Sequence, residues 1–427
     1  MAVSANTQRP LRLAVLCPHF EPDTAPTGEV ITAIVHELAT RGHEIHVVTA
    51  LPWYRHHAVE DGWTGRRVRH ETMPWGSITR VDPFPGRDKR SIARRAAGFV
   101  GFSALAGIES IRGGRVDGVL AMSPPFTLGL TGWAVHLVRR GPLVYNVQDV
   151  FPDAAIATGA ISGRPLIAVA RRVERLSYAR SAAITVVGEE MRANVAAKVP
   201  ARRAGDVVVV PNFVDTDVIR PLDRRTELRA RLGIGAEPVV MYAGNVGFSQ
   251  SLGIVVDVAR RMPGVTFLVN GGGSGLPALV EQAAGVPNVR FNGYEPKERL
   301  AEVLATGDVH LVPLRAGLAS VSVPSKTYAI LAAARPVVAS IDPGTEVPRL
   351  LGEAGAGVSV PPEDADALHE ALVELLADDA RRAAMGAAGR AWVEANASPA
   401  AAASAYEALF RRLSRPSPRP PNERSPR

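Results

Sequence analysis

The sequence predicts an α/β protein with two successive doubly wound domains, and three observations support this prediction. A chain of 427 residues is too long for one ordinary hydrophobic core and fits two domains of roughly 200 residues each. Short apolar strands alternate with segments long enough for helices in the first half of the chain. The same alternation restarts near residue 205.

The first half opens with an apolar strand, a loop and an amphipathic helix. We expect the strand at Leu11–Leu16, the helix at Glu29–Thr40 and the next strand at Ile45–Thr49. This order is typical of a right-handed parallel unit. Three further buried strands are expected, at Gly118–Met122, Leu143–Val147 and Ala183–Val187.

The second half repeats this pattern with more glycine after its strands. It opens with strands at Val207–Val210 and Pro238–Ala243, followed by a helix at Ser251–Arg261. Further strands are expected at Thr266–Val269, Val289–Phe291, Val309–Val312 and Pro336–Ala339, and helices at Leu276–Ala284, Glu298–Leu304, Ser325–Ala333 and Asp364–Leu376.

These patterns predict two Rossmann-like domains that face a central cleft. We assign residues 1–205 to the N-terminal domain and residues 206–390 to the C-terminal domain. For residues 391–413 we expect a helix, and its return to the N-terminal domain is left open. Residues 414–427 form a basic tail that we expect to be disordered, because it has little to bury. Ligands of such sheets bind beyond the carboxyl ends of the strands.

Composition and charge exclude several classes of protein. A net charge of +7 is modest for a chain of this length and disfavours a dedicated nucleic-acid binder. Cys17 is the single cysteine, which excludes an internal disulfide and a cysteine-based zinc site. The histidines show no metal-ligand spacing. No secretory signal or membrane-spanning apolar run is apparent, so we expect a cytoplasmic protein.

Glycine-rich turns after the strands indicate where a phosphorylated ligand could bind. Gly28 directly precedes a helix, where free backbone N–H groups favour an anion, although a simple strand–helix turn explains it equally well. The G-x-G-x-x-G signature is absent there, which disfavours a nicotinamide or flavin cofactor. Two further turns, 244–247 and 271–275, follow neighbouring strands of the second half. Together they suggest a diphosphate or nucleoside ligand held by backbone N–H groups.

Three charged residues are candidates for the chemistry of the cleft. Lys326 follows Pro324 and Ser325 at a predicted helix start, where it could add a full positive charge or simply lie on the surface. Glu346 could accept hydrogen bonds from ribose hydroxyls or could favour its helix N-terminus. Asp149, at the end of a buried strand, could orient an acceptor or act as a base.

A basic segment precedes an apolar helix in the N-terminal half. Arg87, Lys89, Arg90, Arg94 and Arg95 come before the apolar stretch from Ala96 to Ile108. The pattern over Arg87–Ile108 fits an interfacial helix that contacts a membrane surface. It equally fits a core-facing helix with a charged start.

The order and spacing of several segments resemble glycosyltransferase family 4, whose members have the two-domain GT-B fold. The resemblance covers about Leu11 to Ala408 and is greatest to bacterial polysaccharide enzymes of the fucosamine-transferase type. It rests on PHFEPDTAPTGEV, RGHEIHVVTA, SPPFTLGL, QDVFPDAA, VVPNFVDTDVIRP, MYAGNVGFSQSL, PSKTYAILAAARPVVAS and GVSVPPEDADAL.

The resemblance implies that the C-terminal domain binds a nucleotide sugar and the N-terminal domain binds the acceptor. By this analogy Lys326 and Asp149 are catalytic, Lys326 holding the diphosphate and Asp149 facing the reacting sugars. The donor-binding set comprises Gly244, Asn245, Gly247, Gly272, Gly273, Gly293, Tyr294, Ser325, Lys326 and Glu346. Gly28 and Glu29 form the acceptor and phosphate loop. No metal and no cofactor is expected, since Lys326 and helix N-termini can stabilise the leaving diphosphate.

The sequence departs from the family pattern at one point. Many members carry two glutamates eight positions apart, and Val321 and Ala329 occupy those positions here. A glycine usual in the family is Ala334. A basic residue is also absent after the Gly244–Asn245 turn. By this resemblance, Lys326 is therefore the main side-chain charge expected to hold the diphosphate.

We therefore expect a retaining, metal-independent glycosyltransferase that uses a UDP-linked sugar, an N-acetylamino sugar being one option. The expected acceptor is a polyprenyl-diphosphate-linked saccharide of cell-surface polysaccharide assembly, at the inner face of the cell membrane. Three alternatives remain open: transfer to a small soluble natural product, a UDP-sugar epimerase on the same architecture, and a non-catalytic sugar-nucleotide binder.

Overall fold

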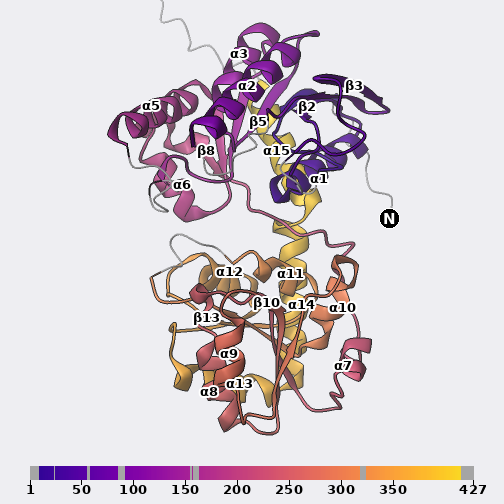
Figure 1. Ribbon diagram of the computed structural model, residues 1–427, viewed down its shortest axis with the longest axis vertical. Helices are drawn as coiled ribbons and strands as arrows, with labels where there is room; N and C mark the ends of the chain where they lie inside the picture. Colours follow the sequence, from indigo (N-terminus) through magenta and orange to yellow (C-terminus); the bar gives the residue numbers. More distant parts are fainter. Residues whose placement is uncertain are drawn as a thin grey trace, which may run out of the picture. The chain divides into compact units, whose positions relative to one another are not determined.

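The computed structural model describes residues 9–23, 25–54, 58–84, 92–153, 156, 163–317 and 324–414. The chain forms two compact units, each built around one parallel sheet with helices on both faces (Figure 1). The N-terminal unit comprises Met1–Pro211 and Ala402–Arg427, and the C-terminal unit comprises Asn212–Ala401. The α/β class with two doubly wound domains is thereby confirmed.

The N-terminal unit contains an eight-stranded sheet in the order β3-β4-β2-β1-β5-β6-β7-β8. All neighbours are parallel except β3, which pairs antiparallel with β4. Residues of β5 and β6 are buried throughout, as expected for parallel strands covered on both faces. The strands are β1 (Arg12–Leu16), β2 (Glu44–Ala50), β3 (Val68–Met73), β4 (Gly76–Val81), β5 (Gly118–Met122), β6 (Leu143–Val147), β7 (Ala183–Val186) and β8 (Val207–Val209).

The helices of this unit follow the strands as a doubly wound fold requires. Helix α1 begins at Pro26, three residues before the expected start, because proline is favoured in a first helical turn. Its apolar stripe at Ile31, Ile34, Val35 and Leu38 is buried. The helices are α1 (Pro26–Thr40), α2 (Ile92–Ser110), α3 (Leu128–Arg139), α5 (Arg164–Arg180), α6 (Glu189–Ala196) and the 3-10 helix η1 (Ala201–Asp206).

Helix α15 (Pro399–Ser414) completes the N-terminal unit from the other end of the chain. The Tyr406 hydroxyl accepts a hydrogen bond from Asn146 at 2.8 Å and lies 3.0 Å from the Thr185 hydroxyl. Phe410 is fully buried against Gly118, where an added Cβ would lie 2.2 Å from its ring. The segment expected as one helix over 391–413 therefore contains the end of α14 (Asp379–Asn396) and most of α15.

The boundary between the units falls later than the sequence suggested. Strand β8 pairs in parallel with β7, with Ile184 opposite Val207, so it is the edge strand of the first sheet. The sequence pattern predicts that the second domain starts at residue 206, whereas the C-terminal unit starts at Asn212. Strand–helix alternation does not reveal which sheet a strand joins, which explains the difference.

The C-terminal unit contains a six-stranded, all-parallel sheet in the order β11-β10-β9-β12-β13-β14. Strand order reverses between β9 and β12, and ligands of open α/β sheets bind beside such a switch point. The strands are β9 (Val239–Asn245), β10 (Thr266–Gly272), β11 (Val289–Asn292), β12 (Val309–Pro313), β13 (Val337–Ser340) and β14 (Gly357–Val360).

Two apolar layers cover the faces of this sheet. Helices α8 (Gly253–Arg261), α9 (Leu276–Gln282) and α13 (Ala365–Leu376) contribute to one layer. Helices α11 (Lys326–Ala332), α12 (Glu346–Ala354) and α14 contribute to the other. The remaining helices are α7 (Glu227–Arg231), η2 (Phe248–Gln250), η3 (Lys297–Arg299) and α10 (Leu300–Thr306).

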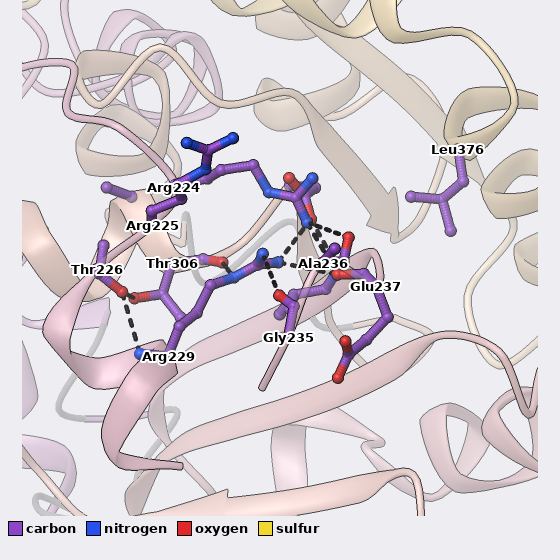
Figure 2. Close-up of polar contacts among 12 residues, drawn as sticks. Arg224, Arg225, Thr226, Arg229, Gly235, Ala236, Glu237, Thr306 and Leu376 are labelled. Carbon is purple, nitrogen blue, oxygen red and sulfur yellow. Dashed lines mark hydrogen bonds and ion pairs between the residues drawn. The ribbon is translucent and has the colours of Figure 1, made fainter. Parts of the chain in front are cut away.

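A buried arginine connects elements at the amino-terminal edge of this second sheet (Figure 2). Arg229 donates to the carbonyl of Thr306 at 3.1 Å and to the carboxylate of Asp308 at 2.9 Å. Its guanidinium also reaches the carbonyls of Gly235 and Glu237. Burial lowers the pKa of Arg229, and Asp308 opposes that shift. The network fixes the amino ends of β9 and β12, away from the carboxyl ends where ligands bind.

Helix α2 occupies the segment for which a membrane contact was considered. Phe102 and Ala106 are buried against the N-terminal sheet, whereas Val100 and Ile108 are more than half exposed. The basic residues Arg87, Lys89 and Arg90 lie outside the described residues, as does the tail beyond Ser414. Among the described helices, none has the length and apolar character needed to cross a bilayer.

Candidate functional site

The candidate site is a cavity of about 650 Å³ at the carboxyl ends of the strands of the C-terminal unit. Its volume lies within the range of small-molecule sites. It is lined by residues that end β9, β10 and β12, by the segment after β11 and by the start of α11. Five predicted donor-binding residues come together in its wall: Gly244, Asn245, Tyr294, Ser325 and Lys326.

Lys326 is the central charge of this cavity. It is the first residue of α11, and its ammonium lies 3.7 Å from the ring centroid of Tyr242. No hydrogen-bond or ion-pair partner of this ammonium is found in the described part of the chain. Burial lowers the pKa of Lys326 to about 7. A desolvated cation without a counterion favours binding of an anion, which would compensate the cost of burial.

Gly244 allows the backbone of the cavity wall to approach Lys326. Its φ is +131°, a conformation that favours glycine, and an added Cβ would lie 3.2 Å from the Lys326 ammonium. The predicted proximity of this turn and Lys326 is therefore present in the structure. An anion beside this turn would meet the positive charge of Lys326 at close range.

Tyr242 is a member of the site that sequence reasoning missed. Its hydroxyl donates to the carbonyl of Asn245 at 2.5 Å, while its ring lies beneath the Lys326 ammonium. Burial raises the pKa of Tyr242. A signal was present, because Tyr242 and Gly244 are two apart on one strand and so share a face.

The second glycine-rich turn braces the first. Gly273 has φ +153°, and an added Cβ would lie 2.4 Å from the carbonyl oxygen of Val246. Tyr294 donates its hydroxyl to the carbonyl of Gly272 at 2.9 Å. Gly272 and Gly273 thus support Asn245 and Tyr294, and neither is among the residues that line the cavity.

The other predicted donor-binding residues lie outside the cavity wall. Gly247 donates its N–H to the Gln250 side chain at 2.9 Å, and Gly293 adjoins Tyr294 with open space beside it. Glu346 starts α12, where its carboxylate forms an ion pair with Arg349. Its contact with a ribose or sugar hydroxyl stays a prediction.

Glu295 is a carboxylate in the cavity wall that sequence reasoning did not select. Asn292 donates to it at 2.9 Å, and Arg231 pairs with it. The hydrogen bond from Asn292 and the nearby arginines lower the pKa of Glu295. Because these groups already neutralise the carboxylate, it repels a bound anion less than an unpaired one would.

The N-terminal unit holds the predicted acceptor-side residues. Asp149 follows β6, and partial desolvation of its carboxylate raises its pKa. Gly28 lies in the first turn of α1, where an added Cβ would lie 2.9 Å from the Cβ of His19. The glycine therefore admits close packing against the preceding loop. A phosphate contact of Gly28 or Glu29 stays a prediction, as does the role of Asp149.

Positions 321 and 329 differ in what the structure describes. Val321 lies outside the described residues, whereas Ala329 lines the cavity one helical turn after Lys326. The small side chain leaves this part of the wall without a carboxylate.

Family models match two parts of the chain. Residues 27–212 match the "Glycosyl transferase 4-like domain", and residues 237–378 match "Glycosyl transferases group 1". The two matches correspond to the N-terminal and C-terminal units.

Three relatives illustrate the range of named activities. A protein of Escherichia coli K12 named "Putative colanic acid biosynthesis glycosyl transferase WcaI" is 26% identical, over 86% of this chain and 92% of that protein. A D-inositol 3-phosphate glycosyltransferase of Xylanimonas cellulosilytica is 27% identical, over 89% and 92%. A GDP-mannose-dependent phosphatidylinositol monomannoside mannosyltransferase of Mycolicibacterium smegmatis is 33% identical, over 43% and 50%.

Solved structures share the fold over nearly the whole chain. Sucrose-phosphate synthase from Thermosynechococcus elongatus superposes with a TM-score of 0.66 at 19% identity, covering 94% of this chain and 99% of the other. HepE from Anabaena, solved in complex with UDP, gives 0.65 at 14% identity, covering 94% and 100%.

The fold, the cavity and the matched models together define a nucleotide-sugar-dependent glycosyltransferase with the GT-B fold. More narrowly, the chain belongs to glycosyltransferase family 4.

Proposed function

We propose that the enzyme transfers a sugar from a UDP-linked donor, an N-acetylamino sugar being one option, to a polyprenyl-diphosphate-linked saccharide. Transfer retains the anomeric configuration and needs no metal ion. The C-terminal unit binds the donor, and the N-terminal unit binds the acceptor. The reaction serves cell-surface polysaccharide assembly at the cytoplasmic face of the membrane. The likeness to WcaI, a glycosyl transferase named for colanic acid biosynthesis, supports this assignment.

The observation that carries the donor site is the buried ammonium of Lys326, unpaired within the described residues, beside the Gly244 turn. A nucleotide sugar presents a diphosphate that can occupy this position. During transfer the bond from the sugar C1 to the diphosphate oxygen breaks, and its electron pair stays on the diphosphate. Lys326 stabilises that growing charge, which is the role a divalent cation would otherwise have. An acceptor hydroxyl oxygen forms the new bond to C1, and its proton passes to the departing diphosphate.

The acceptor assignment is supported by the exposed apolar residues of α2. Val100 and Ile108 are exposed at 59% and 51%, and Arg94 and Arg95 precede them in the sequence. Apolar side chains beside a basic segment favour an anionic membrane surface, where a polyprenyl acceptor is held. Flotation with anionic liposomes tests this assignment. We expect Arg94→Glu combined with Arg95→Glu to abolish flotation, and absence of flotation by the unaltered protein contradicts a lipid-linked acceptor.

A GDP-mannose donor with an inositol-containing acceptor is the second candidate. It is favoured by the names of two relatives, one GDP-mannose-dependent and one acting on D-inositol 3-phosphate. The two candidates differ in the nucleotide base of the donor and in the acceptor. Both use the same diphosphate site.

A thermal-shift screen with UDP, GDP, dTDP and ADP, each with EDTA, tests the donor site directly. We expect UDP to stabilise the protein most, in proportion to its occupancy. Lys326→Met should abolish the shift, whereas Arg290→Met, which removes an exposed charge on β11, should preserve it. Preference for GDP would select the second candidate. A full UDP shift in Lys326→Met would contradict the proposed diphosphate site.

A further inference from the structure

A buried histidine–aspartate pair lies in the loop between β1 and α1 of the N-terminal unit. The Nδ1 atom of His19 is 2.6 Å from a carboxylate oxygen of Asp23, whose side chain is fully buried. The other oxygen of Asp23 accepts the backbone N–H of Tyr54 at 3.2 Å. Both oxygens are thus committed to the protein, and the pair joins the loops that follow β1 and β2.

This arrangement fixes what the other ring nitrogen can do. A carboxylate only accepts hydrogen bonds, so Nδ1 of His19 carries the hydrogen and Nε2 of the neutral ring is an acceptor. Within the described ranges Nε2 has no hydrogen-bond partner, and it is not among the buried unpaired atoms. The ring therefore presents one oriented acceptor to solvent from an otherwise buried position.

Aromatic side chains flank the same ring. Trp53 stacks on His19 with centroids 5.6 Å apart and planes at 23°, and Tyr54 packs edge-on at 5.4 Å. Tyr54 is 40% exposed. Sugar and cyclitol rings combine hydroxyl edges with apolar C–H faces, so an oriented polar atom beside aromatic rings matches both properties.

A second histidine–carboxylate pair in the same region is exposed and serves as a comparison for His19. His36 lies 2.7 Å from Glu21, but both side chains are about 40–45% exposed. Gly28 adds to the contrast, because its missing Cβ lets α1 pack directly on the His19 loop. The fold thus accommodates the buried pair, whereas the His36 pair lies on the surface.

We propose that His19, oriented by Asp23 and flanked by Trp53 and Tyr54, is the recognition site for a hydroxylated ring of the acceptor. Nε2 accepts a hydrogen bond from a ring hydroxyl, and Tyr54 contacts the C–H face of the ring. The inference rests on the proposed function, since it supplies the acceptor side of the same glycosyl transfer. His19 takes no proton from the acceptor; its role is to bind and orient the acceptor ring.

Saturation-transfer NMR on the full chain, with saturating UDP, tests the site without turnover. The probes are methyl N-acetyl-α-D-glucosaminide, methyl α-D-mannopyranoside and myo-inositol 1-phosphate. We expect at least one probe to bind the unaltered protein, and His19→Gln and Asp23→Asn to weaken it by about tenfold. His36→Gln should bind it as before. Tyr54→Ser, at the exposed edge of the site, should also weaken binding and covers the case in which the buried pair cannot be changed without unfolding.

Two outcomes overturn the inference: no probe binds the unaltered protein, or a probe binds His19→Gln and Tyr54→Ser as tightly as the unaltered protein. UDP binding in the thermal-shift screen distinguishes failure of this acceptor site from failure of the proposed function. If UDP and the other nucleotides fail to bind, the donor site and the proposed function fail. If UDP binds and depends on Lys326 while the probes ignore His19, only the acceptor site is wrong.

Discussion

The ammonium of Lys326 lies over the ring of Tyr242, 3.7 Å from its centroid, and the hydroxyl of the same tyrosine donates to Asn245. One side chain thus supports both the charge and the turn of the donor cavity. Cation–π attraction partly compensates the burial that lowers the pKa of Lys326. The site is therefore sensitive to pH and to the identity of residue 242.

Donor affinity should fall as the pH rises through about 7, where the free Lys326 loses its proton. A bound diphosphate favours the charged lysine, so binding raises its pKa and takes up a proton. Calorimetry of a nucleotide sugar at pH 8, in buffers of different ionisation enthalpy, should show uptake approaching one proton. The uptake should vanish in Lys326→Met. Uptake that persists in this variant would assign the proton to another group.

The lowered pKa of Lys326 also determines how its contribution to the free energy of unfolding changes with pH. Lys326 titrates near pH 7 when folded and near 10.5 when unfolded, so the unfolded chain binds more protons between these values. The contribution of this residue to the free energy of unfolding should rise with pH over this window. Urea denaturation of the unaltered protein and Lys326→Met at pH 7 and pH 10 measures the difference. A contribution that falls with pH would contradict the lowered pKa.

Replacing Tyr242 should separate its two roles. Tyr242→Phe keeps the ring beneath Lys326 and loses the hydrogen bond to Asn245, which should weaken donor binding by about 1 kcal/mol. Tyr242→Leu also removes the cation–π contact, so the pH midpoint of donor binding should fall by roughly one unit. Isothermal titration across pH measures both effects. Equal midpoints in the two variants would exclude a role for the ring.

Gly273→Ala should damage the donor cavity without a direct ligand contact. An alanine here is strained because φ is +153°, and its Cβ would lie 2.4 Å from the carbonyl oxygen of Val246. The turn must therefore shift, and Asn245, which precedes Val246, shifts with it. We expect at least tenfold weaker UDP binding by titration calorimetry. Gly264→Ala is the matched control, because it has open space and no positive φ. Equal UDP affinity in both variants would show that the turn tolerates a side chain.

Arg229→Met should destabilise the C-terminal unit by about 1–3 kcal/mol, because buried Asp308 would keep Arg224 and the backbone N–H of Val239 but lose its buried partner. Hydrogen exchange of peptides from β9 and β12, followed in urea, reports this locally. Arg260→Met removes an exposed pair with Asp257 and should cost less than about 1 kcal/mol. Arg229→Met combined with Asp308→Leu should recover part of the loss. No recovery would assign the loss to packing.

The strands at Gly118–Met122 and Leu143–Val147 were predicted with their observed bounds. Parallel strands buried on both faces are continuous apolar runs, which the sequence displays directly. The pair β3 and β4 was missed, because Val68–Met73 is a half-exposed edge strand rich in polar residues. Its pairing depends on a neighbour and leaves little pattern of its own.

The candidate site was predictable to the extent that it follows the ends of strands. Gly244, Asn245 and Lys326 each follow or begin an element whose position the pattern indicated, and they line one cavity. Glu295 was missed because its role depends on contacts across space, and Tyr242 was missed although its spacing from Gly244 places both on one face of a strand. His19 and Asp23 are four residues apart in a loop, where spacing alone does not indicate that the side chains meet.

The return of α15 to the first sheet makes the C-terminal unit an insertion within the N-terminal one. Arg411 donates to the carbonyl of Arg9, so early and late segments of the chain meet in one folded body. During synthesis the surface around Gly118 therefore stays uncovered until the segment through residue 414 has emerged from the ribosome. A premature stop after the second sheet would harm the half of the enzyme that had already been translated.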